Sequence, residues 1–277
     1  MADRLTNRQW LTLINKYMGL NGRATLDWKA VLGLEGGYGE NKIKTVADAM
    51  LPENEGTWPG IWFQSGQKDY SVYNRYDYIY SLLFGKQISA GTIKMVIDDL
   101  VNRSLWTPKF ILIDWGGSAF TAKDLLDSGA PISTLCTVNF RGPQMDFARW
   151  YFREERLVPR WTFRYDDELD SRTALRESLQ SRSTAKVWLF SEVLEHVKSP
   201  LEYWDNLCAE FNIQDAYIAN SFCTPAYGHH IPVIMDGKEC HTVRIANKAW
   251  RKGMEERGYT LRKMKGWNSR LWHVRKE

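Results

Sequence analysis

The chain lacks the features that mark membrane-spanning, disulfide-rich and zinc-binding proteins. No apolar run in its 277 residues approaches the length of roughly 18 residues that a membrane-spanning helix needs. Its four cysteines, Cys136, Cys208, Cys223 and Cys240, lie far apart without a C-x-x-C pair, which argues against a disulfide framework or a zinc knuckle. The first ten residues lack the apolar core of a secretory signal. We therefore expect a cytoplasmic protein without a membrane partner.

Internal repeats and low-complexity tracts are also missing, and so is the G-x-G-x-x-G turn of dinucleotide-binding proteins. That last absence argues against a nucleotide-dependent oxidoreductase. Aromatic residues are abundant at 13%, which suits an aromatic-lined site as well as a dense core. The net charge is only +4, but from His241 onward eleven Lys and Arg residues stand against three acidic ones. This basic segment predicts either a phosphate-binding face or a solvated surface.

Two regions with different patterns follow one another along the chain. Residues 1–106 predict a helical and irregular cap or substrate region, with helical spacing at 7–18, 74–84 and 89–105. Residues 107–277 alternate apolar runs with helical segments, which predicts an α/β domain with a doubly wound, mostly parallel sheet. The expected strands are 110–114, 134–139, 161–165, 186–190 and 216–220, and the expected helices are 119–127, 144–156, 172–181 and 200–211. A helix at 246–257 and an antiparallel hairpin, 259–264 with 270–274, should close the domain.

The stretch FILIDWGGSAF joins an apolar strand to a helix through two glycines. Asp114 ends the expected strand, and Gly116 and Gly117 follow it directly. Glycines at this point let a ligand approach the backbone, where the start of the helix offers free N–H groups. A tight turn without any ligand needs the same glycines, so both interpretations stay open.

Three motifs in a fixed order resemble the class I S-adenosylmethionine-dependent methyltransferases. The strand–Asp–Gly turn comes first, the acidic pair of RYDDEL follows the third strand, and SEVLEHV follows the fourth. The resemblance extends from about residue 107 to the C-terminus and implies S-adenosylmethionine as the cofactor. It implies that the acid and the turn hold the methionine part, that Asn139 faces the ribose, and that the acidic pair lies by the adenine. The implied cofactor-binding residues are Asp114, Gly116, Gly117, Ser118, Asn139, Asp166 and Asp167.

The SEVLEHV motif also carries a possible metal site. On a helix Glu192, Glu195 and His196 would fall at i, i+3 and i+4 and share one face. Carboxylates with an imidazole suit Mn²⁺ and related ions, with Mg²⁺ also possible. The motif resembles the metal site of small-RNA 2′-O-methyltransferases and quinone-biosynthesis O-methyltransferases, which implies His241 as a fourth ligand and Mg or Mn as the metal. The simpler alternative is a charged helix start, stabilised by the helix dipole.

The acceptor side of the site is less specific. Glu195, His196 and His229 are the predicted catalytic residues, the last on the loop NSFCTPAYGHH, where Tyr227 and His230 are equally well placed. The resemblance implies O-methylation, and the acceptor is expected to be RNA, DNA or a small aromatic molecule.

An alternative function is a scaffold that keeps the methyltransferase fold but has lost the chemistry. Ser118, Phe120 and Asn139 support it, because they stand where the family usually has glycine or an acid.

Overall fold

The protein is described from a computed structural model. The structure describes residues 5–23, 25, 79, 94–102, 109–128, 130–139, 142–154, 161–165, 169–180, 184–191, 193–194, 197–219, 233–264 and 271–276. Of the helix expected at 74–84, only Ile79 falls within these ranges, and it is helical and buried. No helix in these ranges is long and apolar enough to span a membrane.

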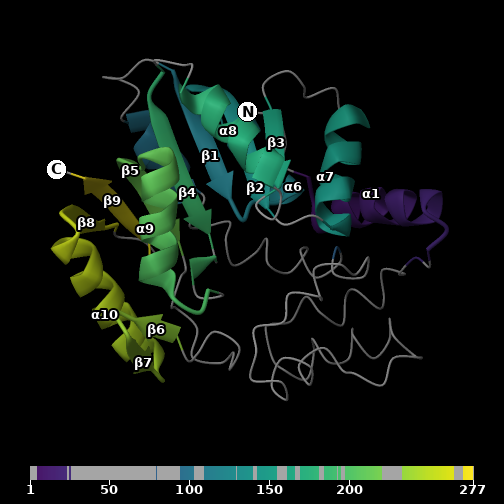
Figure 1. The fold of residues 1–277 in the computed structure, drawn as a ribbon. Coiled ribbons are helices and arrows are strands. Elements are labelled where there is room, and N and C mark those ends of the chain that lie inside the picture. Colours follow the sequence, from purple (N-terminus) through teal and green to yellow (C-terminus); the bar gives the residue numbers. More distant parts are fainter. Residues whose placement is uncertain are drawn as a thin grey trace.

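A seven-stranded sheet with the order β3-β2-β1-β4-β5-β9-β8 forms the centre of the molecule (Figure 1). Strands β1 to β5 are parallel, β9 runs antiparallel to β5, and β8 runs antiparallel to β9. The strands are β1 Phe110–Trp115, β2 Ile132–Asn139, β3 Trp161–Tyr165, β4 Lys186–Ser191, β5 Asp215–Ala219, β8 Tyr259–Lys263 and β9 Leu271–Lys276. The predicted doubly wound sheet with an antiparallel closing hairpin is confirmed.

Helices cover both faces of this sheet. One face packs against α1 (Asn7–Leu20), α6 (Ala119–Asp127) and α7 (Pro143–Glu154). The other face packs against α8 (Leu169–Gln180), α9 (Pro200–Phe211) and α10 (Val243–Glu256). The sequence placed α6 and α9 at these same residues and missed the ends of the other helices by up to three residues.

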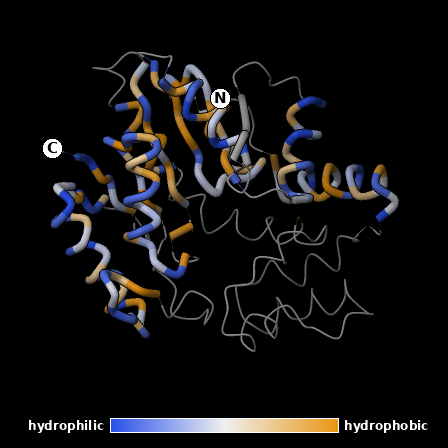
Figure 2. The backbone as a smooth tube through the Cα atoms, viewed as in Figure 1, coloured by the Kyte–Doolittle hydropathy of each residue, from blue (hydrophilic) through white to orange (hydrophobic). Residues whose placement is uncertain are grey.

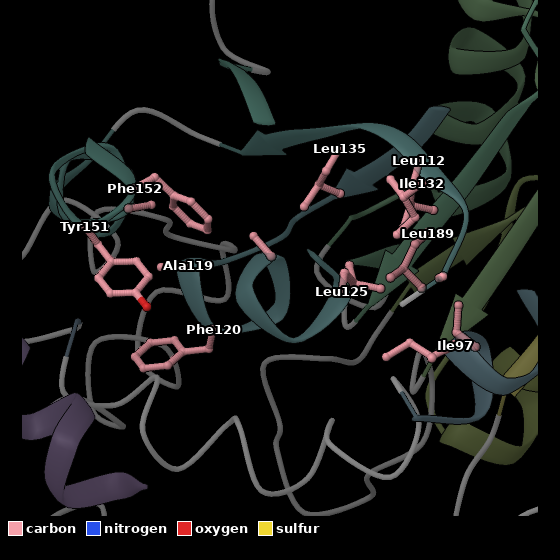
Figure 3. Packing of buried hydrophobic residues seen from close by; sticks show 14 of the residues in the cluster. Ile97, Leu112, Ala119, Phe120, Leu125, Ile132, Leu135, Tyr151, Phe152 and Leu189 are labelled. Atoms are coloured by element: carbon pink, nitrogen blue, oxygen red, sulfur yellow. The ribbon is translucent and has the colours of Figure 1, made fainter. Parts of the chain in front are cut away.

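The central strands β1, β4 and β5 are buried on both sides over most of their length, which explains their apolar sequences. All six residues of β1 are buried, and successive side chains point to opposite faces. Leu112 and Leu189 belong to the core under α6, where Figure 3 shows them close to Leu125 and Ile132. Ile113, on the other face, belongs to the second core. Figure 2 shows hydrophobic residues gathered in the central strands.

The described N-terminal residues pack against the same core. The indole of Trp10 is 1% exposed, and its centroid lies 4.3 Å from that of Phe120 and 4.9 Å from that of Tyr151. Further along the chain, Tyr217 of β5 donates a hydrogen bond from its hydroxyl to Asp99, in the helical segment 94–102. The described helices of the predicted cap are therefore attached directly to the domain that starts near residue 107.

A second, two-stranded sheet was not predicted from the sequence. Strands β6 (Val233–Met235) and β7 (Lys238–Cys240) form an antiparallel hairpin, where only a loop was expected. Asp236 and Gly237 form its turn with φ values of 47° and 76°, and Asp-Gly is a strong signal for a two-residue hairpin turn. Arg257 fixes this turn by donating to Asp236 at 3.1 Å.

Candidate functional site

Asp114 lies near the carboxyl end of β1 and is completely buried. Neither of its carboxylate oxygens has a hydrogen-bond partner within the described part of the chain. Burial raises the pKa of this carboxyl from 3.8 to about 7. Since a buried carboxylate without donors is energetically costly, its position calls for a cation or a hydrogen-bond donor from elsewhere.

The glycines after Asp114 cannot carry side chains. Gly116 has a φ of 80°, and a Cβ on it would lie 2.3 Å from Cγ2 of Val193. A Cβ on Gly117 would lie 2.0 Å from Oδ2 of Asp114. The turn therefore needs glycine at both positions, once for the backbone conformation and once for the space that the carboxylate takes.

Buried polar side chains gather around this turn. Among the described residues, the buried polar or charged ones are Asp114, Thr137, Asn139 and Gln144. Thr137 is the register partner of Asp114 across β1 and β2, Asn139 ends β2, and Gln144 lies in the first turn of α7. All four thus lie where β1 and β2 end, at the edge of a parallel sheet where ligands commonly bind.

Asn139 supports the glycine turn directly. Its side-chain Nδ2 donates to the carbonyl oxygen of Gly117 at 2.9 Å. The backbone nitrogen of Gly116 also donates to the carbonyl of Val138 at 2.7 Å. Two hydrogen bonds therefore connect the end of β2 to the turn. An acid at position 139 has no N–H to donate, so the amide is required for this bond.

Replacing Asn139 with aspartate should therefore destabilise the folded protein, although the methyltransferases that the sequence resembles usually have an acid there. The carboxylate would face the carbonyl of Gly117, and we expect the free energy of unfolding to fall by about 2 kcal/mol. Urea unfolding at pH 8 measures this loss, and Asn139→Ala separates a lost bond from repulsion. An Asn139→Asp variant as stable as the wild type would contradict the bracing role.

The two departures from the family's glycine pattern have local explanations. Ser118 is the N-cap of α6, where its Oγ accepts from the backbone N–H of Thr121 at 3.4 Å. Phe120 is 2% exposed, and its ring contacts Trp10 and lies 6.3 Å from that of Phe147 between their centroids. Its bulk is thus taken up by the packing of α6 against α1 and α7 (Figure 3).

The segment after β4 meets the glycine turn through Val193, whose Cγ2 lies beside Gly116. Leu194 is fully buried in a 3₁₀ turn, Val193 is in no helix, and α9 begins only at Pro200. Glu192, Glu195 and His196, for which the sequence suggested helical spacing, lie outside the described residues, so that spacing stays a prediction. The motif after β4 and the glycine turn after β1 do lie next to each other, as the Val193–Gly116 contact shows.

His241 lies between β7 and α10 and is exposed. Its Nε2 is 3.5 Å from a carboxylate oxygen of Glu239. Within the described ranges no three His, Cys, Asp or Glu side chains are grouped so that they could hold a metal ion. The other predicted site residues lie outside those ranges, so their roles remain predictions; they are Asp166, Asp167, Glu192, Glu195, His196 and His229.

Comparison with known proteins gives a match in structure alone. No family model and no curated protein matches the chain. Mitomycin 7-O-methyltransferase MmcR matches with a TM-score of 0.55 at 12% identity, over 91% of this chain and 76% of its own. An O-methyltransferase family protein from Burkholderia thailandensis matches with a TM-score of 0.53 at 14% identity, over 85% of this chain and 71% of its own. The small RNA methyltransferase HEN1 gives a TM-score of 0.48 at 17% identity over 68% of this chain, which spans only 25% of HEN1.

The fold is that of the class I S-adenosylmethionine-dependent methyltransferases, as the sequence predicted. The described residues that are buried and polar, or that have to be glycine, lie in this chain where β1 and β2 end. Sequence reasoning missed Thr137 and Gln144, because an uncharged polar residue in an apolar segment gives little signal before its burial is known.

Proposed function

We propose that the chain is a methyltransferase that uses S-adenosylmethionine. The observation that carries this proposal is the buried Asp114 carboxylate, without a hydrogen-bond partner among the described residues and enclosed by Gly117. The methionine part of the cofactor bears an ammonium group and a sulfonium group, so it would supply the positive charge that this carboxylate needs. The residues present thus fit the cofactor.

When bound, the cofactor supplies a methyl group that is activated by the positive sulfur. The chain's own residues then have to bind, orient and exclude water, since methyl transfer in line needs little beyond positioning. Asp114 in its ionised form would hold the cationic end, and Asn139 would keep the Gly116–Gly117 turn in place. Asp166 and Asp167 remain the proposed contacts of the adenine.

The proposed acceptor atom is an oxygen, on a nucleic acid or a small aromatic molecule. Glu195, His196 and His229 are the proposed catalytic residues. A divalent ion, Mg or Mn, held by Glu192, Glu195, His196 and His241 would lower the pKa of an acceptor hydroxyl and align it. The packing of Val193 against the turn supports this arrangement, because it places the segment after β4 beside the cofactor end of the sheet.

Calorimetric titration of S-adenosylmethionine into the purified protein tests the proposal. We expect the wild type to bind S-adenosylmethionine with micromolar affinity. The control variant Asp98→Asn changes an exposed acid on another element and should bind like the wild type. Repeating the titration with EDTA tests the metal, since a metal site predicts a change in affinity or heat. A wild-type protein that is folded yet shows no binding heat would favour the scaffold alternative instead.

A further inference from the structure

The basic excess of the C-terminal segment lies largely on its surface. In 241–264 and 271–276 there are nine Lys and Arg residues against two acids, Glu255 and Glu256. Two of the nine are engaged elsewhere, since Arg257 pairs with Asp205 and Arg262 pairs with Asp99. The remaining seven are exposed, and Lys252 alone of them has an ion pair among the described residues, with Glu256 at 3.3 Å.

Helix α10 orders four of these cations into one stripe. Arg244, Lys248, Arg251 and Lys252 follow the i, i+4, i+7, i+8 spacing that places side chains on one face of a helix. The opposite face of α10 is buried in the core. The stripe is about 12 Å long at 1.5 Å per residue.

The stripe continues onto the edge of the sheet. The guanidinium of Arg251 lies over the ring of Trp272, 4.9 Å from its centroid, and Lys263 is the register partner of Trp272. Leu271, the residue before Trp272, pairs with Ala219 at the carboxyl end of β5. The basic surface therefore reaches the carboxyl end of β5, which is the end of the sheet at which the proposed methyl-transfer site lies.

A membrane is a poor partner for this surface. Basic amphipathic helices bind bilayers by inserting their apolar face. That face of α10 consists of Val243, Ala246, Trp250, Gly253 and Met254, and all of them are buried within the protein. Insertion would require α10 to leave the core, whereas a polyanion can bind the exposed side of the helix without any rearrangement.

From these observations we infer that Arg244, Lys248, Arg251 and Lys263 form a surface that binds the phosphate backbone of a single nucleic-acid strand. The stripe is one helix wide, which fits one backbone rather than the two of a duplex. Binding is sequence-independent and sensitive to salt, because contacts to phosphate carry no base information. The surface does not depend on methyl transfer, although it would make a nucleic acid the favoured acceptor class.

Fluorescence anisotropy with a labelled 20-nucleotide single-stranded RNA tests the surface in the absence of S-adenosylmethionine. A failure here is thus distinguishable from a failure of the proposed activity. Arg244→Gln, Lys248→Gln and Lys263→Gln are combined in one variant, and Arg251 is kept because it packs on Trp272. We expect affinity to fall about tenfold, and the slope of log K against log salt to become less negative by about 2.

The matched control removes the same charge on other elements, through Lys94→Gln, Lys109→Gln and Arg153→Gln, and should bind within about twofold of the wild type. Melting temperatures check that both variants fold. Equal weakening by the two variants would overturn the inference, as would the absence of RNA binding at low salt. So would tighter binding to phosphatidylserine vesicles, or to duplex RNA, than to the single strand at equal phosphate concentration.

Discussion

Asp114→Asn is expected to make the protein more stable at pH 8 while it weakens cofactor binding. The pKa of this carboxyl is about 7 in the folded protein against an ordinary 3.8. Between these values the folded chain keeps a proton that the unfolded chain has lost, so stability falls as the pH rises from about 4 to about 7. The two pKa values differ by an amount equivalent to on the order of 4 kcal/mol. The amide removes this loss, so the variant should gain most of it at pH 8.

The affinity of Asp114→Asn for S-adenosylmethionine should be lower than that of the wild type. Removing one partner of a buried charge pair costs about 3–5 kcal/mol, which corresponds to a loss of about 100-fold or more in affinity. Affinity of the wild type should rise with pH until about 7 and then level off, since only the ionised carboxylate of Asp114 attracts a cation. The variant should lack this dependence.

Urea unfolding at pH 5 and pH 8, together with calorimetric titration at both, measures the two effects. The stability difference between the variant and the wild type should shrink toward pH 5, where the Asp114 carboxyl of the folded protein is protonated. Asp98→Asn serves as the control for both readouts. A variant that is less stable than the wild type at pH 8 would show that Asp114 has a stabilising partner, and would remove the reason for placing a cation there.

Gly117→Ala is expected to destabilise the fold and to disrupt the proposed cofactor site as well. The added Cβ would lie 2.0 Å from Oδ2 and 2.4 Å from Cγ of Asp114, and a buried strand leaves the carboxylate little freedom to move. Overpacking of this kind costs about 3 kcal/mol. Displacement of Asp114 should also lower the affinity for S-adenosylmethionine at least about tenfold.

Gly19→Ala provides the matched control, because nothing lies within 4 Å of the Cβ that it would add near the end of α1. There alanine should raise stability by up to about 1 kcal/mol. Thermal melting and calorimetric titration of the two variants side by side give the result. The steric role of Gly117 is falsified if Gly117→Ala keeps wild-type stability.

The arrangement of strands and helices was predictable because the pattern is strong where a parallel sheet is buried. Strands β1 and β4 each contain a run of consecutive apolar residues, FILI and VWLF. Helix α9 begins with Pro200 at its first residue and ends before Asn212. The hairpin β6–β7 was missed although its Asp236-Gly237 turn is visible in the sequence. Its strands have only three residues each, too few for an alternating pattern to show.

The sequence predicted where the candidate site lies, but it did not predict the contacts that its residues make. Asp114 and the two glycines are evident from the sequence, because strand, acid and turn are consecutive. The bond from Asn139 to Gly117 and the direction of Phe120 toward Trp10 depend on residues far away in the chain. Phe120 therefore looked like an obstacle to the cofactor, although its ring is part of the packing beneath α6.

Val193 and Gly116 are 77 residues apart in the sequence, and their contact packs the segment after β4 directly against the glycine turn after β1. A methyl group of Val193 occupies the space that a side chain on Gly116 would need, so neither segment can approach the other any further. If the segment after β4 shifts toward the turn when an acceptor or a metal binds, the turn that would face the proposed cofactor has to shift as well. A ligand bound at the segment after β4 and a ligand bound at the glycine turn would then change each other's affinity by the same factor.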